Sequence, residues 1–517
     1  MKKTNIRPVV FWTPMILLVA GLVISLAAGD SFFSVLNKVN TALLSNFGWL
    51  YSLTTLIVLL VCFAVMLSPF GKIKVGGKDA EPKMKAKDIF AIVLCSIVGI
   101  GMVTWGTAEI MAHYTAPLST LGLEPYSDGA ADFAMETVLL HWTFPAYGLY
   151  ALPSVLFAFI FYNMKRPFSV REFLYPVFGK KMEGKISGAV DIVCVFTLLC
   201  GMVGTIGTAV LSLLGGITHL SGGGIGKTPL AIAVLVAVIV VTFVVSSVTG
   251  VMKGIRILSN MNLYFFAFLA VFTLICGPTA FIFNYGVEGA GNMIAHFFSS
   301  MLRTNAVSGD DWSYWWSIFY WAAYMTWAPI SAMFIGKVCY GQTFRRILSL
   351  TLVWPSIFTA VWMSIFSGTS MHFERAGYGV ADAYAKGYEY TVYAVFEHLP
   401  FPFLITVVFL CVACISVVTA SDSATDSLAG LVTAKEQRGQ NEGKKTWVKV
   451  IVGLVIGVST FIIVVYSDIS GVKMISNIGA FPALWIELLT VAGIVRIMKD
   501  PQKYDENKKD YDEQGRY

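Results

Sequence analysis

Long apolar runs dominate this sequence and constrain its fold more than any other feature. Roughly twelve of them reach the length of about 18 residues that an α-helix needs to cross a bilayer. They lie near 9–28, 48–68, 88–113, 136–163, 187–219, 229–250, 257–284, 312–340, 347–367, 402–431, 447–467 and 474–498. No segment alternates apolar and polar residues as a membrane barrel does. The sequence therefore predicts an all-α integral membrane protein with twelve transmembrane helices.

The loops between these runs alternate in charge, and this alternation predicts on which side each loop lies. Lys and Arg concentrate after the even-numbered runs, in segments 72–87, 165–185, 253–256, 337–346 and 435–445. Basic loops stay in the cytoplasm, so both termini are expected there. The net charge of +6 then follows from topology and indicates no nucleic-acid partner. A soluble protein is excluded, because 13% of the residues are charged and soluble domains carry about 25%.

Two local patterns have competing explanations. The first apolar run follows Lys2 and Lys3 and ends in "SLAAGD", which also fits a cleaved signal peptide. The run is longer than a usual signal core, so a retained helix is favoured. All eight cysteines lie inside apolar runs, and Cys411-x-x-Cys414 has no second pair or histidine beside it. The cysteines therefore indicate packing and no metal site.

Interruptions in two of the runs predict how the helices are organised. The third run contains Gly99, Gly101 and Gly106, and the eighth contains Pro329. Small residues also serve helix packing, but interrupted spans in corresponding positions of two halves indicate the binding site of a secondary transporter. The two runs are five apart, so spans 3–7 and 8–12 fit an inverted repeat. The predicted parts are two N-terminal helices with a basic cytoplasmic loop (1–87), a first five-helix unit (88–284), an external interfacial helix (285–311), a second five-helix unit (312–498) and a charged, solvated cytoplasmic tail (499–517).

Aromatic residues gather in the fourth and eighth runs. Trp316, Tyr320, Tyr324 and Trp327 are spaced four, four and three apart and share one helical face. Trp142, Tyr147 and Tyr150 lie around Pro145 in the fourth run. An interfacial belt explains the aromatic residues near the start of the eighth run, but not those near its middle. Aromatic rings that converge in a cavity bind a quaternary ammonium, which has no N–H to donate, and backbone N–H groups at an unwound helix suit a carboxylate on the same substrate.

Several of these stretches together resemble the betaine/choline/carnitine transporter (BCCT) family. They are "WSIFYWAAYMTWAPISAMFIGKVCYGQTFRRI", "HWTFPAYGLY", "GVMKGIRILSN", "WGTAE" and "VVTASDSAT", and the resemblance covers nearly the whole chain. It implies a LeuT-like inverted repeat over spans 3–12, alternating access and a homotrimer. By position, the substrate would contact Trp142, Tyr147, Tyr150, Tyr324 and Trp327, with Gly99 and Gly101 on the flexible third helix.

The chain departs from the family pattern at the centre of this set. Ala323 and Tyr324 stand where family members usually carry two tryptophans, and Tyr147 stands where a tryptophan is common. Trp is the best cation–π partner and Ala323 removes a large side chain. We therefore expect a reshaped cavity and a bulkier or differently headed onium substrate.

The resemblance also implies a sodium site between helices 3 and 10. Its ligands would be the carbonyls near Cys95 and Val98 and the hydroxyl of Thr419, since sodium prefers hard oxygen ligands. Asn262 stands where the sodium-independent exchangers of the family carry an Arg, which favours an ion-filled site. A second family sodium site is expected to be lost, because its usual positions hold Leu198, Met202 and Ile330.

Three ionisable residues within the apolar runs, Glu109, His141 and Asp422, could carry protons or ions or could brace helices. The bracing role is favoured.

The sequence thus predicts a plasma-membrane transporter that imports glycine betaine, choline or a carnitine-like compound with sodium as its coupling ion and no other cofactor. An ion-independent exchanger of onium compounds is the alternative. A membrane enzyme is disfavoured, because the six histidines have no ligand spacing.

Overall fold

The computed structural model describes residues 6–97, 99–183, 186–249, 251–433 and 446–517. These residues lie almost entirely in helices, and within them there is no β-strand, only two isolated bridges between Ile6 and Thr433 and between Lys74 and Thr343. The all-α architecture predicted from the apolar runs is confirmed.

The long helices account for the predicted number of spans. They are α1 (Pro8–Ala28), α2 (Asp30–Leu67), α5 (Asp128–Trp142) continued by α6 (Phe144–Ala158), α8 (Ile186–Leu220), α9 (Pro229–Thr249), α10 (Val251–Cys276), α13 (Ser317–Val338), α14 (Phe344–Leu348) continued by α15 (Trp354–Arg375), α18 (Pro402–Val432) and α19 (Thr446–Lys499). Among the described residues, ten such segments are long and apolar enough to cross a membrane. The pair α3 (Ala86–Ile97) and α4 (Gly99–Thr115), bent by 59°, makes an eleventh span. α19 holds two spans, because its backbone at Asp468 is not helical (φ 50°, ψ −144°).

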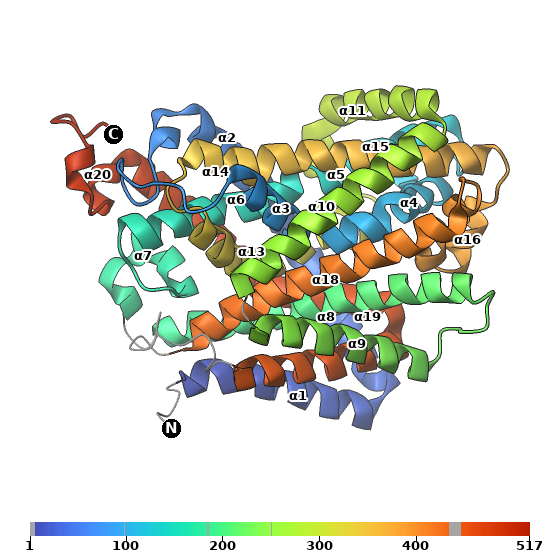
Figure 1. The fold of residues 1–517 in the computed structure, drawn as a ribbon, viewed down its shortest axis with the longest axis horizontal. Helices are drawn as coiled ribbons and strands as arrows, with labels where there is room; N and C mark the ends of the chain where they lie inside the picture. The colour runs from blue at the N-terminus through green and yellow to red at the C-terminus, as the bar shows by residue number, and fades with distance from the viewer. Residues whose placement is uncertain (1–5, 98, 184–185, 250, 434–445) are drawn as a thin grey trace.

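Shorter helices connect the spans. They are α7 (Tyr175–Phe178), α11 (Thr279–Met301), α12 (Trp312–Trp315), α16 (Val380–Lys386), α17 (Thr391–Glu397) and α20 (Pro501–Tyr504), with 3-10 or π turns at Pro69–Lys72, Ser119–Leu121, Phe159–Asn163, Val170–Leu174, Gly179–Glu183, Ser349–Val353, Tyr388–Tyr390 and Lys508–Asp510. Figure 1 shows the start of α1, α7, α14 and α20 at one end of the bundle and α16 at the other. The second half of α11 occupies the predicted external segment 285–311, and α12 begins where that segment ends.

α13 lies at the centre of the bundle. In its most apolar window 94% of the residues are buried, compared with 28% for α9 and α10. α13 packs against α6, α8, α19 and α2. Its aromatic side chains therefore face protein, and a lipid-interface belt does not explain Tyr320, Tyr324 or Trp327, which are each 6% exposed or less.

The C-terminal segment is folded back onto the protein, so the prediction of a solvated tail was wrong. Asp505 is fully buried and accepts hydrogen bonds from Asn163 Nδ2 at 2.9 Å and Tyr511 Oη at 3.0 Å. The Lys78 backbone N–H donates to Asp510 at 2.7 Å, and the Lys74 backbone N–H donates to the Tyr517 hydroxyl at 3.1 Å. The many charges of this segment suggested a solvated chain. In the structure, several of these charged side chains instead pair with the loop that follows α2.

Candidate substrate-binding site

A cavity lies in the middle of the bundle. Five spans contribute to its wall: the bent pair α3 and α4, the pair α5 and α6, α8, α13 and α19. The lining residues are Ile97, Ile100, Gly101, Trp105, Trp142, Tyr150, Gly201, Gly204, Thr205, Thr208, Phe319, Tyr320, Ala323, Tyr324, Thr326, Trp327, Val472 and Ser476. None of these side chains carries a charge.

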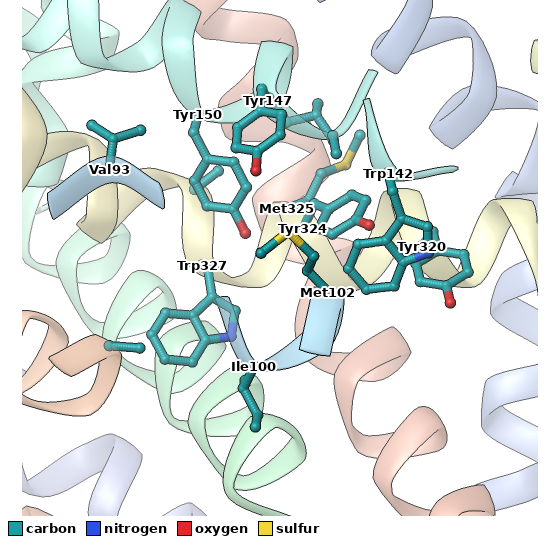
Figure 2. Close-up of a cluster of buried hydrophobic side chains, with 14 of the residues drawn as sticks. Val93, Ile100, Met102, Trp142, Tyr147, Tyr150, Tyr320, Tyr324, Met325 and Trp327 are labelled. Atoms are coloured by element: carbon teal, nitrogen blue, oxygen red, sulfur yellow. The ribbon is translucent and has the colours of Figure 1, made fainter. Parts of the chain in front are cut away.

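Four of the predicted aromatic residues line this one cavity: Trp142, Tyr150, Tyr324 and Trp327. We call these four the aromatic cage. The Tyr324 ring lies edge-on to the rings of Trp142 and Tyr150, with centroids 6.2 and 6.4 Å away. Figure 2 shows Tyr150 and Trp327 on one side of this space and Trp142, with its neighbour Tyr320, on the other.

Local breaks in the helices place Trp142 in the cage. Trp142 is the last residue of α5, and Thr143 has non-helical angles (φ −110°, ψ −129°). Pro145 then stands in the first turn of α6, where its missing N–H is tolerated, and it prevents a continuous helix. Gly101 completes the fit, because a Cβ there would lie 2.7 Å from Trp142 Cη2. The indole therefore packs directly on the α4 backbone.

The other two residues of the predicted substrate set lie away from the cavity wall. Tyr147 is fully buried, and its hydroxyl lies 2.7 Å from Thr359 Oγ1 on α15. Gly99 faces α18, where a Cβ would lie 3.2 Å from Ser416 Oγ. Tyr147 and Gly99 therefore contact the helices behind the cavity, α15 and α18.

Glu109 on α4 forms a hydrogen-bonded centre behind the cage. Its carboxylate accepts from Trp142 Nε1 at 2.5 Å and from the Tyr320 hydroxyl, and it lies 2.6 Å from His141 Nδ1 and 3.3 Å from His113 Nε2. Glu109, His113 and His141 are fully buried. Their ligand atoms are close enough together to hold a metal ion, but four partners already satisfy the carboxylate. We interpret the cluster as a hydrogen-bond network that brings α4, α5 and α13 together.

A second charged residue near the cavity is Lys473 on α19. Its Nζ lies 4.2 Å from the ring centroid of Trp316 and 4.7 Å from that of Phe319, and it donates to the Trp315 carbonyl at 3.0 Å. Phe319 lines the cavity, so the ammonium is separated from it by an aromatic ring. One negative and one positive group thus stand one layer behind an uncharged wall.

The remaining ionisable residue of the predicted trio, Asp422, braces two helices. Its Oδ2 accepts a hydrogen bond from the Ser246 hydroxyl on α9 at 2.6 Å. This contact ties α18 to α9, which is the bracing role that the sequence favoured.

The predicted sodium ligands are only partly within the described residues. Cys95 and Thr419 are described and buried, whereas Val98 lies outside the described residues. Asn262 on α10 donates from Nδ2 to Ser416 Oγ at 2.8 Å and contacts Cys95 Sγ at 3.7 Å. Its Oδ1 is buried and has no hydrogen-bond partner in the described part of the chain. A buried amide oxygen without a donor is the kind of ligand that a hard cation prefers.

The α8 wall of the cavity was not predicted from the sequence. Gly201, Gly204, Thr205 and Thr208 follow the spacing of one helical face, which is a signal for a helix that closely approaches a neighbour. Nothing in a single sequence says which helix that neighbour is. The structure shows that it is α13 on one side and α19 on the other, through Trp327 and Ser476.

Comparison with known proteins gives a consistent result along the whole chain. The family model described as BCCT, betaine/carnitine/choline family transporter, matches residues 9–503. A probable glycine betaine transporter of Desulfitobacterium hafniense (strain Y51) is 28% identical over 91% of this chain and 93% of its own length. The glycine betaine transporter OpuD of Bacillus subtilis (strain 168) is 27% identical over 96% and 95%. An ectoine/hydroxyectoine transporter of Virgibacillus pantothenticus is 28% identical over 99% and 100%.

Among solved structures, the chain is similar to a Na+-coupled sialic acid symporter. The TM-score is 0.49 at 12% identity, over 86% of this chain and 87% of the other.

Proposed function

The chain belongs to the betaine/carnitine/choline transporter family, and on that premise we propose that it imports an onium compound by alternating access. One observation carries this proposal, namely that Trp142, Tyr150, Tyr324 and Trp327 line a single buried cavity. Each ring face can attract a desolvated cation by about 0.5–2 kcal/mol without needing an N–H from the substrate. The named relatives are transporters, and the protein is not an enzyme.

The uncharged wall favours a substrate that brings its own counter-charge. A simple cation in this cavity would have no carboxylate in contact with it, because Glu109 lies behind the rings of Trp142 and Tyr320. A zwitterion carries its own carboxylate, which the backbone N–H groups of a broken helix can bind. The bend between α3 and α4 lies beside the cavity, since Ile97, Ile100 and Gly101 line it.

Sodium coupling is the second part of the proposal. Asn262 Oδ1 supports it as a buried oxygen without a partner among the described residues, in a side chain whose amide nitrogen contacts Cys95 Sγ. The Thr419 hydroxyl donates to the Ile415 carbonyl at 2.8 Å and keeps lone pairs for an ion. An exchanger that needs no gradient is the alternative, and it requires that this region hold no ion.

Uptake into proteoliposomes tests both parts. Labelled glycine betaine, choline, carnitine and dimethylglycine are offered with and without an inward sodium gradient. We expect at least one compound to accumulate, and only with the gradient. Failure of every compound to be transported or to compete would refute the onium assignment. Counterflow that is unchanged without sodium, with no accumulation, would establish the exchanger instead.

Two cage variants test the site separately from the function. We expect Trp327→Ala and Tyr150→Ala to weaken substrate affinity roughly fivefold to thirtyfold, since each removes one cation–π partner. Trp354→Ala and Tyr466→Ala are matched controls, because those side chains are 54% and 57% exposed on the bundle surface. Unchanged affinity in both cage variants would show that the substrate binds elsewhere.

For location we propose the plasma membrane, with both termini in the cytoplasm and three copies of the 56.5 kDa chain in the assembly. The shared position of α1's start and α20 at one end of the bundle supports the common side of the termini (Figure 1). Accessibility of the termini to protease in sealed cells tests their location. The mass of the detergent-solubilised assembly tests the number of copies.

A further inference from the structure

The cavity extends beyond the aromatic cage to a second wall of different chemistry. That wall is formed by α8 and α19 and is lined by the hydroxyl-bearing residues Thr205, Thr208 and Ser476. The hydroxyl of Thr326 on α13 adjoins it. We call these four residues (205, 208, 326 and 476) the hydroxyl wall. A methylated onium head needs no hydroxyl, so this wall contacts another part of the substrate.

Close helix packing keeps the hydroxyl wall next to the cage. A Cβ at Gly201 would lie 2.7 Å from Thr326 Oγ1 and 2.9 Å from Trp327 Nε1, and a Cβ at Gly204 would meet Ser476 Oγ. The backbone of α8 therefore lies directly against α13 and α19. Ala323 on α13 also lines the cavity and leaves room beside the cage that a larger side chain would fill.

The hydrogen bonds of the wall determine what it can offer. Thr208 donates to the Gly204 carbonyl at 3.1 Å, Ser476 to the Val472 carbonyl at 3.0 Å, and Thr326 to the Ala323 carbonyl at 2.6 Å. Each of these hydroxyls has its proton engaged and presents only lone pairs. Thr205 is the exception: no hydrogen bond to another described residue involves its hydroxyl. Three acceptors and one free hydroxyl match a ligand that brings a hydrogen-bond donor.

Resting on the function proposed above, we infer that the substrate is an onium compound with a hydroxyl or N–H donor beyond its charged head. The head lies in the aromatic cage and the donor reaches the hydroxyl wall, with Thr205 as its main partner. Glycine betaine, which has no such donor, fills the cage but leaves the wall without a hydrogen-bond partner. The Ala323 side of the cavity accommodates the extra length.

Matched ligand pairs that differ by one hydroxyl test this inference on the full-length transporter. Carnitine is compared with its deoxy analogue 4-(trimethylammonio)butyrate, and hydroxyectoine with ectoine, in competition against whichever labelled compound is transported. One added neutral hydrogen bond predicts a roughly threefold to tenfold preference for the hydroxylated member of a pair. Thr205→Val, which has the same shape and no hydroxyl, is expected to abolish this preference. Thr205→Ser is expected to restore it.

Thr242→Val is the matched control, because Thr242 lies on α9 and its hydroxyl donates to the Val238 carbonyl of its own helix. It should leave the preference intact. Equal affinity for both members of every pair, with cage variants still defective, would overturn this inference and leave the proposed function standing. If no onium compound binds at all, the proposed function fails first. Ala323→Trp provides a second measurement: it should exclude the longer hydroxylated compounds while glycine betaine still competes.

Discussion

The buried carboxylate of Glu109 is linked to the aromatic cage by hydrogen bonds. Its carboxylate accepts hydrogen bonds from Trp142 and Tyr320, and both of these side chains line the cavity. A hydrogen bond to an anion increases the electron density of the donating ring. The cage should therefore bind cations more strongly than isolated rings would.

We predict that Glu109→Gln weakens substrate affinity by roughly tenfold, or about 1.4 kcal/mol. The amide removes the charge and turns one acceptor into a donor, which then faces the N–H and O–H groups that bonded the carboxylate. Isothermal titration calorimetry of the purified variant measures its substrate affinity. Glu136→Gln is the control, because Glu136 is also buried and hydrogen-bonded, to His296 at 2.9 Å and Ser300 at 2.7 Å, but neither of these partners is among the residues that line the cavity. Equal losses in both variants would contradict the role given to Glu109.

Glu487 on α19 is a different kind of buried carboxyl. It is fully buried, and neither of its oxygens has a hydrogen-bond partner among the described residues. An unpaired carboxylate inside a membrane protein is costly, so we expect this group to carry its proton. We predict that Glu487→Gln keeps substrate accumulation unchanged between pH 6 and pH 8. Loss of accumulation with retained counterflow would instead assign proton coupling to Glu487.

At the scale of the helix, α8 depends on having no side chain at Gly201. We predict that Gly201→Ala lowers stability by about 1–3 kcal/mol, as for overpacking in a filled core, and weakens substrate binding because Trp327 must move. Thermal unfolding and binding affinity are measured together. Gly188→Ala on the same helix is the control, since among the described residues nothing beyond its chain neighbours and its own helix backbone lies within 4 Å of the added methyl group. Unchanged affinity in Gly201→Ala would show that Trp327 can shift without cost.

At the helices that form the site, the sequence predicted some of the side chains that reach the cavity and not others. Helical spacing gave one aromatic face in each of two runs, and the family resemblance selected the substrate set that includes Trp142, Tyr150, Tyr324 and Trp327. The structure brings these four around one cavity. Tyr147 shares the face of Tyr150 by spacing, but its ring packs toward α15 and Thr359. Helical periodicity gives the direction of a side chain to within a face, whereas the tertiary packing of neighbours decides whether it reaches the cavity.

At the scale of the whole molecule, the number of spans and the all-helical class followed from hydrophobic runs alone. The docking of the C-terminal segment did not, because charge and low hydrophobicity usually indicate a solvated chain. Asp505 is buried only through partners that are distant in sequence, Asn163 among them. Such long-range pairing has no periodic signature in a sequence.

We predict that Asp505→Ala releases the C-terminal segment from the bundle. The change leaves Asn163 Nδ2 and the Tyr511 hydroxyl without their shared acceptor, a loss of about 1–3 kcal/mol at this contact. Limited proteolysis should then cut within residues 505–517 faster than in the unmodified protein. Asp512→Ala is the control, because Asp512 is solvent-accessible and pairs locally with Arg516 at 2.9 Å. Equal cleavage rates for all three proteins would contradict the docked arrangement.

The uncharged lining of the cavity has an electrical consequence. A zwitterion contributes no net charge when it crosses the membrane, and the cavity wall adds none, since Glu109 and Lys473 stand behind aromatic rings. Any current recorded during uptake of a zwitterion therefore counts the coupling ions alone. Uptake of a zwitterion with one sodium ion would move one positive charge, worth about 2.3 kcal/mol per 100 mV of membrane potential. Membrane voltage would then drive accumulation as directly as the sodium gradient does.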